Sequence, residues 1–317
     1  MTRQRLRLGI SRCLLGEAVR FDGGHKRDHF LVDVLGPHVE WIPVCPEIEA
    51  GLGLPREAMR LVGDPARPRL ITVHTGNDHT KALERMSAHR LQSLRELDLS
   101  GYVFKRDSPS CGLERVRLYN QHGMPSRQGV GIFARAFIKQ FPLVPVEEEG
   151  RLSDPALREN FIERVFAYRR YQDLLLKLSA RQAVVQFHTT HKYLLLSHSP
   201  SHYEALGRLV GQAHRYRSKE LAQKYGDLFM QALAVKATVR KHVNVLQHLV
   251  GFFKTDLTGQ QKRELLDLVE DYRRGYTPLV VPLTLIKHYV MACDVSYLKE
   301  QMYLNPHPKE LMLRNHV

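Results

Sequence analysis

The 317-residue sequence contains only four cysteines, and no two of them form a CxxC pair. Paired spacing is typical of structural zinc sites, so its absence argues against one. The sequence also lacks any run approaching the roughly 18 apolar residues that a membrane-spanning helix needs. Its start, MTRQRLRLGISRCLLG, is basic but lacks the apolar stretch of a secretory signal peptide. We therefore expect a cytoplasmic protein with no membrane partner.

Internal repeats and low-complexity segments are missing as well. Hydrophobic residues make up 43% of the chain and charged residues 25%, which is typical of a soluble globular protein. The length allows two domains that each bury a core of their own. In a reducing compartment the cysteines are expected to be thiols, ligands or nucleophiles rather than disulfides. We expect no nicotinamide or flavin cofactor, and no feature indicates an oligomeric state.

Positive charge is concentrated in the second half of the chain. Residues 1–150 contain 22 Lys and Arg against 18 Asp and Glu, whereas residues 151–317 contain 25 against 15. The second half also holds 10 of the 17 histidines. A basic surface of this size attracts polyanions, of which nucleic acid is the commonest. A solvated basic surface without a particular partner is the alternative.

The first half alternates short apolar runs with helix-like stretches, which is typical of βα units and a mostly parallel sheet. We predict helices at about 79–97 and 131–140. Strands are predicted at 5–11, 39–44, 69–74, 101–104 and 115–119. Residues 1–150 are therefore predicted to form a Rossmann-like α/β domain.

The polar stretch EEEGRLSDP, residues 147–155, marks the predicted domain boundary near residue 150. Ser153 and Asp154 are placed there to cap a following helix. Beyond this stretch the hydrophobic period changes from two to about 3.6, which indicates amphipathic helices. These helices are predicted at 160–175, 183–198, 202–216, 221–253, 262–276 and 281–293. Residues 151–317 are thus predicted to form an all-helical domain.

Three cysteines, Cys13, Cys45 and Cys111, each follow a strand-like run at the point where it breaks into a turn. Ligands and reactive groups collect at the carboxyl ends of the strands in open α/β sheets, so these thiols can meet despite their wide spacing. We predict that they belong to one metal site with one coordination position left open.

The spacing of the three cysteines leaves four interpretations open. A [4Fe-4S] cube held by three thiolates leaves one iron free as a Lewis acid with a preference for sulfur. A catalytic zinc with three cysteines is a less common arrangement. The other two are a single nucleophilic cysteine and buried thiols without a function.

Polar residues surround the three cysteines in the sequence, and they favour a functional site over an apolar core. In a core each polar group would need a satisfied partner. Lys105 and Arg106 are placed to contact a phosphate or the charge of a cluster. The other neighbours are Ser11, Glu47, Glu49, Ser108 and Ser110.

The first half resembles the TudS thiouracil desulfidase family through the segments ISRCLLG, VRFDGGHKR, PVCPEIEAGLGLPRE and FKRDSPSCGLERVRLY. The resemblance spans about residues 5–145. The second half resembles the YbgA-type helical domain through FHTTHKYLLLSHSPSHYEALG. This combination resembles fusion proteins whose implied role is removal of sulfur from thiouridine in tRNA.

The resemblance implies a [4Fe-4S] cluster bound by Cys13, Cys45 and Cys111, with an open iron that receives the sulfur of the substrate. It also implies catalytic roles for Glu47 and Ser108. The fourth cysteine, Cys293, lies outside this set and is expected to be an ordinary buried thiol.

The mechanism that we expect is a non-redox exchange of sulfur for oxygen at thiouracil, with the cluster as Lewis acid. Glu47 would act as general base on water, and Ser108 would hydrogen-bond the ring or relay a proton. Ser11, Lys105 and Ser110 are candidates for substrate binding. Purely structural roles remain open for both residues, since Glu47 could cap a helix and Ser108 could simply form a turn.

The expected substrate is 4-thiouridine in tRNA, which yields uridine and sulfide. Basic and aromatic residues alternate in the helical half, where cations can hold phosphates while rings stack on bases. The RNA-binding candidates are Arg169, Arg170, Lys192, Arg215, Arg217, Arg240 and Lys241. Alternatively, the protein acts on free thiouracil or thiouridine monophosphate, or it is a non-catalytic iron–sulfur regulator that binds RNA.

Two weaker motifs have competing interpretations. Gly23 and Gly24, followed by HKR, are predicted either to hold a phosphate or to form a plain turn. His188 and His191 have the spacing of a metal pair on one helical face, but no third ligand accompanies them at a recognised spacing.

Overall fold

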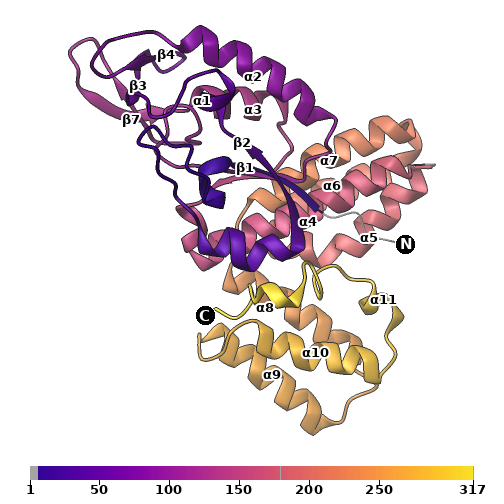
Figure 1. Cartoon of the computed structure of the whole chain (residues 1–317). Coiled ribbons are helices and arrows are strands. Elements are labelled where there is room, and N and C mark those ends of the chain that lie inside the picture. The colour runs from indigo at the N-terminus through magenta and orange to yellow at the C-terminus, as the bar shows by residue number, and fades with distance from the viewer. Residues whose placement is uncertain (1–5, 179, 317) are drawn as a thin grey trace. The chain divides into compact units, whose positions relative to one another are not determined.

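The computed structural model describes residues 6–178 and 180–316 of the chain. The chain divides into two compact units, Met1–Ser153 and Asp154–Val317, and each is described by itself (Figure 1). The first unit contains β-sheets covered by helices, and the second is helical. The predicted combination of a parallel-sheet α/β domain and a helical domain is confirmed.

The main sheet of the first unit has four strands in the order β2-β1-β5-β8, and all of its paired strands run parallel. Its strands are β1 (Leu6–Ser11), β2 (Val39–Val44), β5 (Gly101–Phe104) and β8 (Val146–Glu148). The predictions at 39–44 and 101–104 are confirmed to the residue. The predicted strand at 5–11 is also present, although Arg5 lies outside the described residues.

An aromatic cluster fills one face of this sheet. The rings of Tyr102 and Phe104 stack with centroids 4.1 Å apart, and Phe133 and Phe137 pack against them. A Cβ at Gly9 would lie 2.1 Å from the Tyr102 ring, so the absent side chain makes room for the aromatic one. Glycine at this position lets β1 and β5 pair closely.

A second, mixed sheet has the strand order β4-β3-β6-β7, and the sequence did not predict it as a separate sheet. Its strands are β3 (Met59–Asp64), β4 (Arg67–Thr72), β6 (Val116–Tyr119) and β7 (Pro125–Gly129). The strand predicted at 69–74 begins two residues earlier, and β3 and β7 were missed. Only one face of this sheet is apolar, so its strands carry many polar residues.

Among the described residues of the first unit, the α-helices are α1 (Pro46–Glu49), α2 (Thr80–Arg95) and α3 (Ile132–Gln140). The predicted helices at about 79–97 and 131–140 are confirmed within a few residues. Leu83 of α2 and Ile132 of α3 pack on Leu61 and Leu118 of the second sheet. This small core anchors the start of α3, which lies close to the candidate site.

The polar stretch predicted as the domain boundary overlaps the end of a strand, β8. Its Glu147 and Glu148 are buried. Glu148 accepts a hydrogen bond from the backbone N–H of Leu113 at 2.7 Å, so the strand fastens the chain just after Cys111. Asp154 caps the next helix by accepting from the N–H of Leu157, as predicted, whereas the Ser153 hydroxyl donates to the Gly150 carbonyl instead.

The second unit consists of helices joined by short turns. They are α4 (Pro155–Leu176), α5 (Arg181–His198), α6 (Pro200–Gly211), α7 (Ser218–Ala234), α8 (Val239–Val250), α9 (Gly259–Arg273), α10 (Val280–Ala292) and α11 (Ser296–Lys299). The single helix predicted at 221–253 is wrong, because the chain breaks between α7 and α8. The Thr238 hydroxyl starts α8 by accepting from the N–H of Lys241.

Cys293 follows the last residue of α10 and is partly exposed. The expectation of a buried thiol is therefore wrong, because the residue lies at the helix end rather than on its packed face. Among the helices within residues 6–178 and 180–316, none is long and apolar enough to cross a membrane.

Candidate functional site

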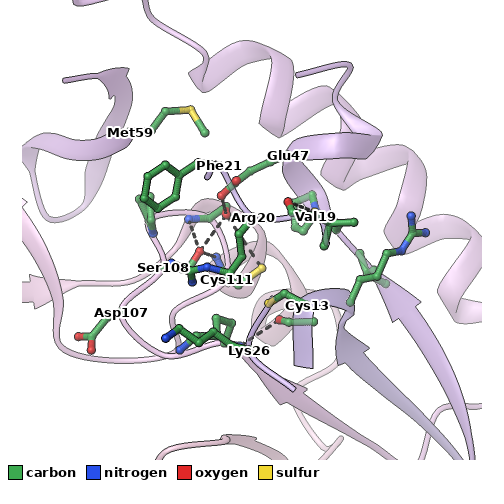
Figure 2. A pocket seen from close by; sticks show the side chains of 18 of the residues that line it. Cys13, Val19, Arg20, Phe21, Lys26, Glu47, Met59, Asp107, Ser108 and Cys111 are labelled. Carbon is green, nitrogen blue, oxygen red and sulfur yellow. Dashed lines mark hydrogen bonds between the residues drawn. The ribbon is translucent and has the colours of Figure 1, made fainter. Parts of the chain in front are cut away.

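The parallel sheet brings the three predicted cysteines to one cavity (Figure 2). Cys13 lies in a 3₁₀ turn directly after β1, Cys45 lies between β2 and α1, and Cys111 lies in the loop that follows β5. All three thiols are buried, and all line a cavity of about 320 Å³. The carboxyl ends of three neighbouring parallel strands therefore converge on one thiol-lined space.

The loop that carries Cys111 is held by its own polar groups. The Ser108 hydroxyl accepts hydrogen bonds from the backbone N–H groups of Ser110 and Cys111. The N–H of Phe133, at the start of α3, donates to the Ser110 carbonyl at 3.0 Å. A Cβ at Gly131 would lie 2.5 Å from this carbonyl, so only glycine lets the helix start approach so closely.

Burial raises the pKa of each of the three thiols. The pKa of Cys13 rises to about 11, although Lys105 opposes the shift, and the pKa of Cys111 rises well above its usual value. Burial also raises the pKa of Cys45. A nucleophilic cysteine needs a lowered pKa, so these surroundings disfavour a single reactive thiolate. They suit ligands whose protons are displaced when a metal binds.

Glu47 lies at the cavity with only 14% of its side chain exposed, and both of its carboxylate oxygens have partners. Oε2 accepts from Nε and Nη2 of Arg56, whose side chain is 8% exposed. Oε1 accepts from the Ser110 hydroxyl, whose oxygen lies 3.0 Å from that of Ser108. A continuous chain of hydrogen bonds therefore runs from Arg56 through Glu47 and Ser110 to Ser108.

Ser11 and Lys105, two further predicted site residues, lie on the same cavity wall. The Ser11 hydroxyl accepts from the backbone N–H of Lys105 at 3.0 Å. Burial raises the pKa of Cys111, and the hydrogen bond from Ser11 to its sulfur opposes part of that rise. The Lys105 ammonium pairs with Glu149. Lys105 therefore links the cavity wall to Glu149 and also contributes a positive charge.

Sequence reasoning missed several residues that line the cavity. Arg56 follows Pro55 in the PRE motif, and Arg20 and Phe21 belong to VRFDGGHKR, so the motifs contained them without indicating a role. Six cations line the cavity against two acids, although most of these cations form ion pairs within the unit. They are Arg12, Arg20, Lys26, Arg56, Lys105 and Arg106, and the acids are Glu47 and Asp107.

Gly23 and Gly24 form a tight turn that presents Arg20 and Phe21 to the cavity. The N–H of Gly23 donates to the Arg20 carbonyl at 2.9 Å, and the N–H of Arg20 donates to the Gly24 carbonyl at 3.1 Å. Gly23 has a φ of +72°, which favours glycine. This geometry supports the plain-turn interpretation over phosphate binding.

The predicted RNA-binding cations of the helical unit differ in their surroundings. Arg215, Arg217 and Arg240 are exposed, whereas Lys192 lies over the ring of Tyr193. The Lys241 ammonium donates to the carbonyls of His198 and Lys236 and so links two helices. Arg169 pairs with Asp173 at 2.8 Å.

Arg170 points into the helical unit. Its guanidinium donates to Nε2 of His191 and to the Pro306 carbonyl, and burial lowers the pKa of Arg170 to about 10. The guanidinium of Arg170 is thus held by partners inside the unit and not at its surface. Since Nδ1 of His191 bonds the Phe187 carbonyl, His191 has no free ring nitrogen for a metal pair with His188.

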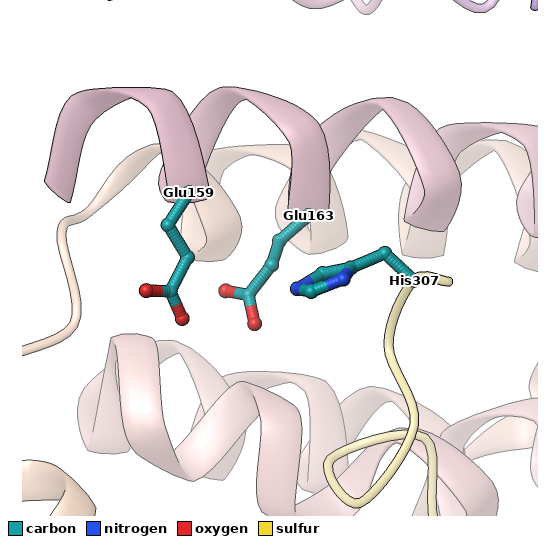
Figure 3. Close-up of side chains that lie close together, drawn as sticks. All are labelled: Glu159, Glu163 and His307. Carbon is teal, nitrogen blue, oxygen red and sulfur yellow. The ribbon is translucent and has the colours of Figure 1, made fainter. Parts of the chain in front are cut away.

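A buried carboxylate pair joins α4 to the C-terminal segment of the chain (Figure 3). Ligand atoms of Glu159, Glu163 and His307 lie within 4.8 Å of one another. Arg314 binds both carboxylates, with contacts of 3.3 Å to Glu159 and 2.6 Å to Glu163. His198 contacts Glu163 at 3.0 Å. The pair thus has its countercharge within the protein.

The two carboxyl groups of this pair respond differently to their surroundings. Burial and the charge of Glu163 raise the pKa of Glu159 to about 8. Burial would also raise the pKa of Glu163, but Arg314 and His198 hold it well below its usual range. Arg314 therefore keeps Glu163 ionised, whereas Glu159 keeps its proton near neutral pH.

Comparison with known proteins gives matches for both units. Residues 8–149 match the family described as 2-thiouracil desulfurase, and residues 192–308 match a family described as a protein of unknown function, DUF1722. The uncharacterised protein YbgA of Escherichia coli is 31% identical over 153 residues, which cover 48% of this chain and 90% of YbgA. The uncharacterised protein YbbK of Bacillus subtilis is 29% identical over 108 residues, covering 32% of this chain and 71% of YbbK.

Among solved structures, the [4Fe-4S]-dependent thiouracil desulfidase TudS is 28% identical and aligns with a TM-score of 0.40, covering 49% of this chain and 97% of TudS. The protein therefore combines two domains. One is an α/β domain with a thiol-lined cavity at its strand ends, and the other is helical. The chain belongs to the YbgA family, and its residues 8–149 form a 2-thiouracil desulfurase domain. Both resemblances noted in the sequence are confirmed.

The raised pKa of Glu159 predicts a pH dependence of stability. Between about pH 4.5 and pH 8 the folded state holds more protons than the unfolded state, so stability falls as pH rises. The variant E159Q has no titrating group at position 159. In differential scanning calorimetry, its unfolding midpoint should therefore fall less between pH 5 and pH 8 than that of the unmodified protein. The exposed control E264Q should follow the unmodified protein. Equal slopes for E159Q and the unmodified protein would contradict the assignment.

Proposed function

We propose that the protein is a tRNA thiouridine desulfidase that replaces the sulfur of 4-thiouridine by oxygen and releases sulfide. The observation that carries this proposal is the thiol-lined cavity, which also holds the hydrogen-bonded chain from Glu47 to Ser108. The 2-thiouracil desulfurase family of residues 8–149 supports the chemistry. The substrate position and the nucleic acid are inferred from the sequence resemblance and from charge.

The donor set fits a [4Fe-4S] cluster held by Cys13, Cys45 and Cys111. Soft thiolates are the ligands that iron–sulfur clusters prefer, and three of them leave one iron open. The three thiols line one cavity, and the cations that line it suit the negative charge of such a cluster. TudS is itself [4Fe-4S]-dependent.

When bound, such a cluster would supply an open iron that acts as a Lewis acid towards the sulfur of the substrate. The protein's own residues would manage water and protons. Arg56 fixes Oε2 of Glu47, and Oε1, which accepts from the Ser110 hydroxyl, would take a proton from the attacking water through its second lone pair. Ser110 and Ser108 continue the path, so the proton can pass along their hydroxyls towards the departing sulfide.

This exchange needs no external electron donor. Water adds its oxygen to the ring carbon, the carbon–sulfur bond breaks, and both protons of the water end on sulfide. The ring is neither oxidised nor reduced. The proton path from Glu47 to Ser108 therefore accounts for what the reaction requires from side chains.

The cavity also offers surfaces for a pyrimidine ring. Phe21 is 40% exposed although it is aromatic, and Met59 lines the same space (Figure 2). Aromatic rings and polarisable thioethers contact bases through their faces. We propose that Phe21 stacks on the thiolated base while the ring sulfur faces the three cysteines.

A polynucleotide substrate accounts for the basic helical unit. A free base would not need a second domain with 25 Lys and Arg against 15 Asp and Glu over residues 151–317. The exposed cations Arg215, Arg217 and Arg240 are the surface candidates for phosphate contacts. An alternative substrate is free thiouracil or thiouridine monophosphate. This alternative is favoured by cations of the cavity itself, such as Lys26, which can bind the phosphate of a single nucleotide.

The cluster assignment predicts the effect of removing each thiol. Anaerobically purified protein should contain iron and sulfide in equal amounts, about four of each per chain. The variants C13S, C45S and C111S should each lose most of this iron, because serine is a poor ligand for a soft site. The variant C293S is the matched control and should keep it. Full iron content in all three cavity variants would refute the assignment.

The proton path predicts how two further variants behave. Both E47Q and S110A should keep the absorption spectrum of the cluster. E47Q should lower kcat for thiouracil by about 10² to 10⁴, the typical contribution of a general base. S110A should lower kcat by about tenfold, because it breaks the link to Ser108. S153A removes an exposed serine hydroxyl and is the control. Unchanged kcat in E47Q would exclude the base assignment.

The polynucleotide assignment predicts a difference between substrates. Full-length holoenzyme should convert 4-thiouridine in tRNA with a kcat/KM at least about tenfold above that for free thiouracil, a difference of about 1.4 kcal/mol in the apparent barrier. Mass spectrometry of the digested nucleosides measures the first reaction. Affinity for tRNA should fall steeply with salt, since phosphate contacts release counterions. A higher kcat/KM for thiouracil would favour the free-base alternative.

A further inference from the structure

A second cavity, of about 480 Å³, adjoins the thiol-lined cavity in the first unit. The two share Met59, Arg106, Asp107 and Pro109 as lining residues, so they meet at one wall. The second cavity is otherwise lined by residues of β3, β6 and β7. The mixed sheet, which the proposed reaction does not use, therefore borders the site directly.

The alternation of side chains along β3 and β6 explains why the second cavity is a polar groove. Leu61 of β3 and Leu118 of β6 are register partners, and both are buried in the core under α2 and α3. Their neighbours Arg60 and Arg117 must project from the opposite face of the sheet. That face is therefore polar and accessible, and it carries the lining of the second cavity.

The groove has a surplus of unpaired positive charge. It is lined by four arginines, Arg60, Arg106, Arg117 and Arg127, and by one acid, Asp107. Asp107 pairs with Arg106 at 3.1 Å. Within residues 6–178 and 180–316, the other three arginines form no salt bridge. Three positive charges therefore face this groove without a carboxylate partner.

One arginine of the groove is held in place but keeps its donors. The Arg60 guanidinium lies over the Tyr119 ring, 5.1 Å from its centroid. Its buried Nε has no hydrogen-bond partner among the described residues. Stacking on an aromatic ring fixes the plane of the guanidinium and leaves its N–H edge to bind an anion. An exposed sheet face with a tyrosine and free arginines matches the chemistry of a single-stranded RNA backbone.

We propose that this groove binds the phosphodiester backbone next to the target nucleotide of an RNA. The inference rests on the proposed function, since it assumes that the base enters the thiol-lined cavity. That cavity has cations of its own for the phosphate of the target nucleotide. Further cations beyond Pro109 are useful only to a ligand with further phosphates. The groove thus selects a polynucleotide over a mononucleotide, and the catalytic unit itself contributes to RNA binding.

The double charge reversal R117E/R127E tests this proposal in full-length holoenzyme. It should lower kcat/KM for thiolated tRNA at least tenfold and leave kcat/KM for free thiouracil within twofold. The plot of log affinity for tRNA against log salt should become shallower by about 1 to 2, since two phosphate contacts are lost. The conservative variant R117K/R127K should keep most of the affinity, because it retains both charges.

The control variant R67E/R85E reverses two exposed arginines of the same unit that do not line the groove. It should behave like the unmodified protein in both assays. Unchanged tRNA turnover and salt slope in R117E/R127E would overturn the proposal, and so would a parallel loss of thiouracil turnover. If unmodified holoenzyme converts neither substrate, the proposed function fails, and the salt slope of tRNA binding still decides whether the groove holds RNA.

Discussion

The parallel register of β1, β2 and β5 is the constraint on which the candidate site depends. Parallel strands end at one edge of a sheet, so the loops that follow them must converge there. Cys13, Cys45 and Cys111 occupy these three loops and lie on one cavity although almost 100 residues separate the first from the last. An antiparallel β5 would carry the third loop to the opposite edge.

Burying three thiols beside a carboxylate has a cost that the surrounding hydrogen bonds offset. A buried polar group without a partner destabilises a fold by about 1–3 kcal/mol. Here both oxygens of Glu47 are bonded, and the Ser108 hydroxyl accepts two backbone N–H groups of its own loop. Glu148 ties down the chain after Cys111. These hydrogen bonds fix Glu47, Ser108 and Ser110, and the proposed proton path uses the same bonds.

Local sequence patterns were sufficient to predict those helices and strands whose buried residues follow a simple pattern along the chain. The runs at 39–44 and 101–104 predicted β2 and β5 to the residue, and β5 is buried along its whole length, as central parallel strands commonly are. They failed for β3 and β7 of the mixed sheet, whose outward residues are polar, and for β8, whose Glu147 and Glu148 are buried carboxylates. They also failed for Arg170, a cation in a basic helix that proved to bond His191 inside the unit. For β8 and for Arg170, tertiary partners allow a charged residue to be buried, which no local pattern indicated.

The sequence by itself determined the division into an α/β half and a helical half, the candidate cysteines and the family of each half, because motifs and hydrophobic periods are local properties. The tertiary structure decided that Ser110 lies between Glu47 and Ser108, that Arg56 holds the carboxylate, and that an arginine-lined groove continues from the cavity. These contacts join loops and strands far apart in the chain. Their geometry is set by the pairing of the sheets, which no local pattern encodes.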